Sequence, residues 1–263
     1  MARCGVVMRG LEFAVSVACA LLTGVLLLCV DRPAAAQKAT ETAACVLPPR
    51  PDTLWALAQC CERSLAGDVG CRAYDEKDQY VIIKDNSVRK PQSYLIIPTK
   101  RVTGIEDGLI TQAPVVDFWQ YGWSRSRTWP GYPPADTAMA INSAHSRTQN
   151  QLHIHISCVR PAVKQALARA EIGFFPAKPV TLRLPPHDNL YRAIKVTSLS
   201  GEQSPFLVFQ ADPAVRDHMA DQSIAVVGSA TPGQYFVLDT RVDGGNTAHA
   251  EELLEQTCQS ATR

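Results

Sequence analysis

The feature that most constrains this chain is an uncharged apolar run near its N-terminus. The run extends from Phe13 to Val30 and follows two basic residues, Arg3 and Arg9. It is about long enough to cross the hydrocarbon core of a bilayer, and the alanines at 34–36 offer a cleavage site. We therefore interpret residues 1–36 as a signal peptide or a single transmembrane anchor. A buried core helix is a weaker alternative because the run has no polar face.

The run also predicts where the rest of the chain folds. Whether the leader is retained or removed, residues 37–263 are expected to be exported. The basic residues precede the run, so a retained anchor would make this a single-pass protein of the inner membrane with its main domain on the periplasmic side.

The cysteines agree with export. Three of the nine lie in the leader, and an even number remains: Cys45, Cys60, Cys61, Cys71, Cys158 and Cys258. No CxxC pair occurs, so a zinc ribbon is not expected. In an oxidising compartment these six cysteines favour disulfides over buried free thiols, although the sequence alone leaves many pairings open.

Charge gives no sign of a polyanionic partner. The chain has 26 lysines and arginines against 25 aspartates and glutamates, and 46% of its residues are hydrophobic. Such a chain can bury a substantial core, but it has no general field that would attract nucleic acid. We therefore expect no nucleic-acid partner, and selectivity must come from a local site.

Short apolar runs separated by turns predict an α+β domain with an antiparallel sheet. Strands are expected over residues 79–84, 93–97, 138–142, 152–159, 191–197, 205–209, 223–228 and 235–240. Helices are expected over 52–66, 161–170 and 248–258, and 117–127 is also compatible with a helix.

The most informative stretch is TQNQLHIHISC, residues 148–158. Alternate side chains of a strand share a face, so Gln151, His153 and His155 are expected on one face and the apolar residues between them on the other. Imidazole is suited to nucleophilic attack or to proton transfer near neutral pH. The stretch therefore predicts a catalytic surface.

Three alternatives compete with that interpretation. An HxH pair supplies two metal ligands, but no motif for a third is evident. The histidines can also be structural, with their ring nitrogens satisfied on a strand face. The phosphoesterases that use two H-x-Ser/Thr motifs are a poor match, since only His155-Ile156-Ser157 fits.

Two blocks of sequence resemble a known superfamily. AINSAHSRTQNQLHIHIS, residues 140–157, resembles the histidine-triad signature, in which alternating histidines follow an asparagine and a phosphate-binding loop. KDNSVRKPQSYLIIPTKRVTGI, residues 84–105, resembles the strand–turn–strand that precedes it. Together the matches cover about residues 79–160. Within this superfamily the chain is most similar to the CDP-diacylglycerol pyrophosphatase (diphosphatase) family, whose members add a membrane segment and a long C-terminal extension.

The resemblance implies a fold and an activity. The fold would be a HIT-like antiparallel sheet with flanking helices and a C-terminal α/β extension from about residue 162. The activity would be hydrolysis of membrane CDP-diacylglycerol to CMP and phosphatidic acid, with no metal or other cofactor. Many members of the superfamily dimerise, so a homodimer is a candidate assembly.

The resemblance also assigns roles to residues. His153 occupies the position of the nucleophile, and His155 would donate hydrogen bonds to phosphate oxygens and help protonate the leaving oxygen. Asp85 would hold the ribose hydroxyls, and the loop residues Asn142, Thr148 and Gln149 would contact the phosphates. A turn-forming role for Asp85 and a capping role for Asn142 are the alternatives.

One position departs from the signature. Gln151 stands where the signature begins with a histidine. Glutamine still donates and accepts hydrogen bonds, so it could contact substrate or orient its neighbours, but it cannot titrate. A mechanism that needs three imidazoles is therefore in doubt. The alternative function is a non-catalytic or metal-dependent exported nucleotide-binding protein.

The same resemblance implies a disulfide pattern. It pairs Cys61 with Cys71 and Cys158 with Cys258, which leaves Cys45 and Cys60 as a third pair.

Overall fold

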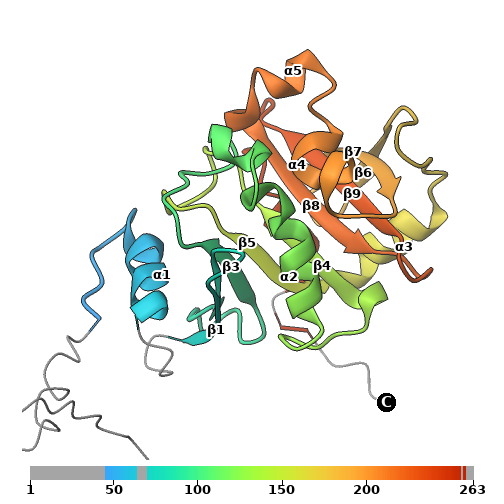
Figure 1. The fold of residues 1–263 in the computed structure, drawn as a ribbon. Helices are drawn as coiled ribbons and strands as arrows, with labels where there is room; N and C mark the ends of the chain where they lie inside the picture. Colours follow the sequence, from blue (N-terminus) through green and yellow to red (C-terminus); the bar gives the residue numbers. More distant parts are fainter. Residues whose placement is uncertain (1–44, 64–69, 256, 259–263) are drawn as a thin grey trace, which may run out of the picture. The chain divides into compact units, whose positions relative to one another are not determined.

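One antiparallel sheet runs through the computed structural model (Figure 1), which describes residues 45–63, 70–255 and 257–258. The strand order is β1-β2-β3-β5-β4-β8-β9-β7-β6, and β10 also pairs with β5. The strands are β1 Cys71–Asp75, β2 Tyr80–Lys84, β3 Tyr94–Pro98, β4 Thr137–Ile141, β5 Ile154–Val159, β6 Val180–Leu184, β7 Asn189–Val196, β8 Gln222–Gly228, β9 Tyr235–Arg241 and β10 Leu254–Glu255.

Short helices surround this sheet. The α-helices are α1 Thr53–Arg63, α2 Phe118–Ser126, α3 Pro161–Arg169, α4 Pro205–Val208 and α5 Pro213–Arg216. The 3₁₀ turns are η1 Gly108–Thr111, η2 Val115–Asp117, η3 Pro134–Asp136, η4 Gly201–Gln203, η5 Met219–Asp221 and η6 Ala250–Leu253. A proline begins α3, where its missing N–H costs nothing, and Val163 and Leu167 form the buried face of that helix.

Both faces of the central strands are buried. On β4, Met139 and Ile141 belong to one apolar cluster with α2, and Ala138 and Ala140 belong to a second cluster with α3 and η6. Every residue of β8 is also buried. Strands covered on both sides need apolar residues at successive positions, and this explains why the central strands are continuous apolar runs in the sequence.

The C-terminal extension continues the sheet. Residues after 162 contribute β6 to β10, and β8 pairs with β4 through Ala138–Val227 and Ile141–Ile224. The predicted antiparallel sheet with a few helices is therefore confirmed, and the extension and the first half share one core.

Two predicted elements differ in the structure, and two strands were not predicted. Residues 205–209 form the short helix α4, because a brief apolar run does not distinguish helix from strand and Pro205 favours a helix start. Residues 248–258 form η6 and β10, and no long helix, because this segment pairs with β5. The strands β1 and β6 were not expected. They end the path of the sheet, where one edge pairs with no other described strand and polar residues are tolerated.

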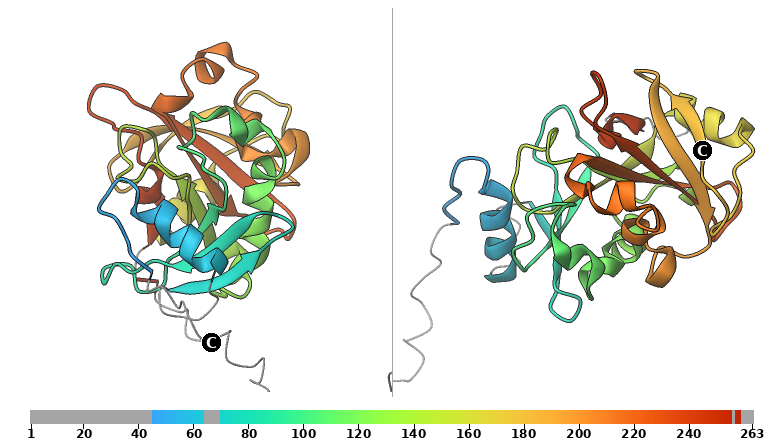
Figure 2. Two further views of the ribbon diagram at one scale, coloured as in Figure 1. Left: turned by 60° about the vertical axis from the view of Figure 1, so that its left-hand side comes forward. Right: turned by 90° about the horizontal axis from the view of Figure 1, so that it is seen from above.

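Three disulfides match the pairing that the family resemblance implied: Cys45–Cys60, Cys61–Cys71 and Cys158–Cys258. The first two hold α1 to the preceding segment and to β1, and α1 packs on the β1–β3 part of the sheet (Figures 1 and 2). Disulfides persist in oxidising compartments, which indicates an extracytoplasmic domain. The predicted leader, residues 1–36, lies outside the described residues. Each helix within the described ranges is too short or too polar to cross a bilayer.

Candidate active site

A cavity of about 370 Å³ opens among α1, the β2–β3 loop, the β4–β5 loop and the segment before η6. It is lined by six of the seven predicted site residues: Asp85, Asn142, Thr148, Gln149, His153 and His155. Seven charged or titratable residues that were not predicted also line it: Arg50, Lys84, Arg89, Lys90, Arg147, His249 and Glu251. A larger cavity, of about 890 Å³, lies over β6, β7 and β9 and contains none of the predicted site residues.

The two histidines enter the cavity from β5. Ile154 and Ile156 are fully buried in the core, and His155 lies between them on the strand. His153 directly precedes the strand. The two imidazole rings stand edge to face, with their centroids 5.0 Å apart, and the exposed fractions of His153 and His155 are 9% and 6%.

The backbone fixes the tautomer of His153. Its Nδ1 lies 2.7 Å from the carbonyl oxygen of Gln151, which can only accept a hydrogen bond. Nδ1 therefore carries the proton, and Nε2 carries the lone pair. Burial lowers the pKa of His153, so the ring is neutral at neutral pH. A neutral imidazole with a free Nε2 is a competent nucleophile.

His155 is buried without hydrogen bonds. Its Nε2 lies 3.3 Å from Glu251 Oε2, but neither ring nitrogen meets the geometry of a hydrogen bond with any described residue. Burial lowers the pKa of His155 to about 3, even though the nearby Glu251 carboxylate opposes that change. An unpaired buried polar ring costs free energy and is expected where a ligand supplies the missing partner.

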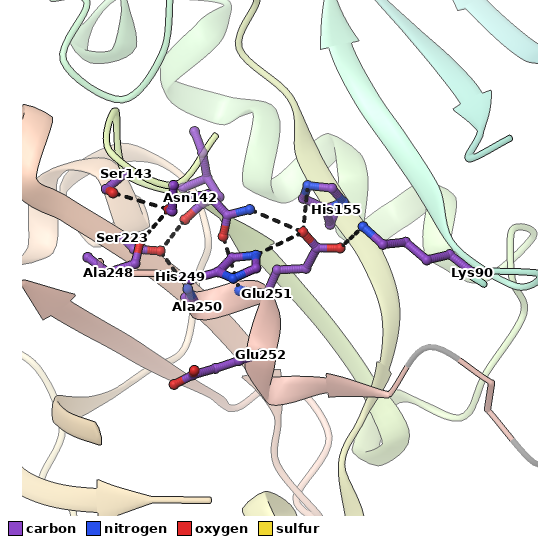
Figure 3. A network of polar contacts seen from close by, with 12 residues as sticks. Lys90, Asn142, Ser143, His155, Ser223, Ala248, His249, Ala250, Glu251 and Glu252 are labelled. Carbon is purple, nitrogen blue, oxygen red and sulfur yellow. Dashed lines mark hydrogen bonds and ion pairs between the residues drawn. The ribbon is translucent and has the colours of Figure 1, made fainter. Parts of the chain in front are cut away.

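Glu251 is the centre of the polar network (Figure 3). Its side chain is 8% exposed and forms an ion pair with Lys90. Its Oε2 accepts a hydrogen bond from Asn142 Nδ2 at 3.1 Å and lies 3.3 Å from His249 Nε2. Burial alone would raise the pKa of the carboxyl, but His155, His249 and Lys90 together hold that pKa below its usual range. Glu251 is therefore ionised.

The segment that carries Glu251 is bonded to the β4–β5 loop. The amide of Ser143 donates to the carbonyl of Ala248 at 3.2 Å, and the Ser146 hydroxyl donates to the same carbonyl at 2.8 Å. The amide of Ala250 donates to the Ser223 hydroxyl on β8 at 2.8 Å. The C-terminal segment and the predicted phosphate loop therefore form one hydrogen-bonded unit (Figure 3).

Gln151 does not line the cavity. Its side chain is fully buried, donates to the carbonyls of Pro98 and Lys100 at 3.1 and 2.8 Å, and accepts from the amide of Val102 at 3.4 Å. The expected strand alternation fails here because β5 begins only at Ile154. The side chain of Gln151 therefore holds the segment after β3 in place through these hydrogen bonds and points away from the two histidine rings.

Other predicted residues combine a place on the cavity with a structural contact. Asp85 accepts from the amide of Ser87 at 2.9 Å, as a turn-forming aspartate does. Gln149 accepts from the amide of Leu54 in the first turn of α1 at 3.1 Å. Asn142 bonds both the side chain and the backbone amide of Glu251. Thr148 is exposed on the rim.

Sequence reasoning missed Lys90, His249 and Glu251. Lys90 lies in an ordinary polar turn, and the other two lie in the segment 248–258, which was predicted to be a helix. No local motif marks them, because the pairing of β10 with β5 is what brings them to the histidines. Within the described ranges, no group of three or more His, Cys, Asp or Glu side chains is arranged to hold a metal ion.

Comparison with known proteins gives a consistent result. The family model described as CDP-diacylglycerol pyrophosphatase matches residues 49–262. The chain is 32% identical over 203 residues to the probable CDP-diacylglycerol pyrophosphatase of Mycobacterium leprae (strain TN), covering 73% of each chain. It is 34% identical over 190 residues to the CDP-diacylglycerol pyrophosphatase of Yersinia pestis, covering 68% of this chain and 72% of that protein.

Solved structures are more distant. The yeast Ap4A phosphorylase aligns with a TM-score of 0.39 and 10% identity over 63% of this chain and 57% of that chain. A DUF4931 family protein from Bacillus cereus aligns with a TM-score of 0.41 and 12% identity over 66% and 87%. Likeness this weak does not establish a shared fold. The family model and the curated relatives, by contrast, match most of the sequence, and the chain therefore belongs to the CDP-diacylglycerol pyrophosphatase family.

Proposed function

We propose that the protein hydrolyses the pyrophosphate bond of CDP-diacylglycerol, giving CMP and phosphatidic acid, and that His153 is the nucleophile. Its relatives in Mycobacterium leprae and Yersinia pestis carry the name of that activity. The observation that carries the proposal is the hydrogen bond from His153 Nδ1 to the carbonyl of Gln151, which leaves Nε2 with its lone pair in a cavity rich in basic side chains.

In the first step, Nε2 of His153 attacks the phosphorus that bears cytidine. A phosphorus–nitrogen bond forms, and the bond from that phosphorus to the bridging oxygen breaks. The bridging oxygen keeps the electron pair and leaves with phosphatidic acid. In the second step, water attacks the same phosphorus, the phosphorus–nitrogen bond breaks, and CMP leaves.

Charges around the cavity support this chemistry. Arg50, Arg89, Lys90 and Arg147 line it and can offset the charge of a pyrophosphate. Arg147 is held in place by two 2.6 Å hydrogen bonds to Glu106. His155 has unpaired nitrogens next to the nucleophile, so we assign it the role of hydrogen-bond donor to the phosphate oxygens and the leaving oxygen.

The nucleoside is assigned to the side of the cavity formed by β2 and α1. Asp85 directly follows β2 and is proposed to accept hydrogen bonds from the ribose hydroxyls, while Asn142, Thr148 and Gln149 lie toward the phosphates. Leu54, Leu57 and Leu95 give this side an apolar wall. Gln151 would contribute by holding the backbone after β3 in position and would not contact the substrate.

The remaining finer assignments come from the sequence. We propose that the sheet is of the histidine-triad type, that the enzyme works at the membrane where its lipid substrate resides, and that residues 1–36 tether it there if they are retained. The homodimer stays a prediction.

The decisive experiment measures CMP release from CDP-diacylglycerol micelles by the purified full chain in excess chelator. Wild type is compared with His153→Ala, and His218→Ala serves as an exposed-histidine control outside the cavity. We expect turnover in wild type and in the control, none in His153→Ala, and an alkali-stable, acid-labile cytidylyl adduct on His153. Turnover that survives in His153→Ala, or that needs added metal, would contradict the proposal and favour a metal-dependent nucleotide-binding site.

A further inference from the structure

A third histidine shares the carboxylate that contacts His155. Glu251 Oε2 lies 3.3 Å from His155 Nε2 on one side and 3.3 Å from His249 Nε2 on the other (Figure 3). His155 is buried next to His153, whereas the side chain of His249 is 45% exposed and lines the same cavity. The two histidines therefore occupy an inner and an outer position around one acceptor oxygen.

The carboxylate fixes the tautomer of His249. Glu251 is held ionised by its ion pair with Lys90 and its hydrogen bond from Asn142, so it can only accept. The proton between Glu251 and His249 is therefore on His249 Nε2, and His249 Nδ1 carries the lone pair. Within the described part of the chain, Nδ1 makes no hydrogen bond. A carboxylate in this position orients an imidazole and stabilises the imidazolium that forms when Nδ1 takes a proton.

The proposed reaction leaves one proton without an assigned acceptor. In the second step, the attacking water must lose a proton while the phosphorus–nitrogen bond breaks. His153 takes back only the electron pair of that bond. His155 is only 6% exposed and both of its ring nitrogens are buried, whereas the side chain of His249 is 45% exposed and can take a proton from water in the cavity and release it to bulk solvent.

We propose that His249, oriented by Glu251, is the general base that activates water in the second step, an inference that rests on the proposed function. The water oxygen forms the new bond to phosphorus and its proton passes to His249 Nδ1. The bond between phosphorus and His153 Nε2 breaks, and the electron pair returns to that nitrogen. CMP leaves, and His249 then gives the proton to solvent.

The test separates the two steps. In His249→Asn, release of phosphatidic acid in the first turnover should stay near the wild-type rate, while steady-state kcat falls by about 100-fold or more. Alkaline quenching followed by mass spectrometry of the intact protein should then show the cytidylyl adduct on His153 at a much higher level in the variant than in wild type. Added imidazole should speed the decay of that adduct. His218→Asn is the matched control, since His218 is 54% exposed and lies 3.7 Å from the Asp221 carboxylate.

Each other outcome has a defined meaning. A fall in kcat without accumulation of the adduct, or unchanged turnover in His249→Asn, overturns the role of His249. Absence of CMP release by wild type overturns the proposed function instead. Thermal unfolding of His249→Asn at the wild-type temperature confirms that the variant is folded, and rescue by imidazole gives a second measurement that a folding defect cannot imitate.

Discussion

The ion pair between Lys90 and Glu251 allows a quantitative test of the site. Their side chains are 21% and 8% exposed, and they are 161 residues apart in the sequence, so the pair connects the β2–β3 loop to the C-terminal segment. Removing one member of a buried pair costs about 3–5 kcal/mol, because the other charge is left without compensation. Glu251 would keep its donors Asn142 and His249, and Lys90 is partly solvated. We therefore expect Lys90→Met to lower the free energy of unfolding by about 2–3 kcal/mol.

A double-mutant cycle isolates the pair. Once Glu251→Gln removes the charge, Lys90→Met should cost at least about 1 kcal/mol less than it does alone. Urea unfolding of the four proteins measures the cycle. Lys164→Met is the control, because Lys164 and Asp136 form a pair that is 41% and 36% exposed and should be worth at most about 1 kcal/mol. Additive effects in the cycle, or equal costs for the two lysines, would refute this account of the site.

The pair also predicts a dependence of stability on pH. The pKa of Glu251 is lower in the folded protein than its ordinary value of 4.5. A carboxyl of this kind contributes stability above its unfolded-state pKa, and the contribution is lost as the pH falls through the folded-state pKa. In Lys90→Met the folded-state pKa of Glu251 rises, so the loss below the unfolded-state pKa is smaller and ends at a higher pH. The difference in stability between wild type and Lys90→Met should therefore shrink as the pH falls and Glu251 becomes protonated in both proteins.

Two further predictions concern the scaffold. The substitution Gln151→His restores the first histidine of the signature. It should lower the free energy of unfolding, measured in urea, by about 1–3 kcal/mol, because imidazole cannot replace three hydrogen bonds to the backbone. A gain in CMP release would show instead that the side chain reaches the substrate. Replacing Cys158 and Cys258 together by serine removes a disulfide with a sequence separation of 100, and it should lower the free energy of unfolding by about 3–5 kcal/mol in the same assay. Turnover should also be slower, because the segment that carries Glu251 is held less firmly. Unchanged stability would show that strand pairing alone holds that segment.

The sequence by itself determined the class of the fold and the segment that carries the paired histidines. Apolar runs with short turns predicted the antiparallel sheet, since pattern length and turn residues are local properties. The stretch from Gln151 to His155 carried the resemblance to the family, and the resemblance to the family also implied the three disulfides. Six of seven predicted residues line one cavity because they lie on β5 or in the β2–β3 and β4–β5 loops, which the pairing of β3 with β5 brings together.

Only the tertiary structure decided how the site is completed. Gln151 looked equivalent to the histidines in the pattern, but the start of β5 at Ile154 turns its amide toward the segment after β3. Glu251 and His249 carry no motif, and nearly a hundred residues separate them from His155 in the sequence. They reach the histidines because β10 pairs with β5 and serine hydroxyls bond the preceding segment to the β4–β5 loop and to β8. Contacts of this range depend on how the whole sheet is assembled, and a local pattern does not encode them.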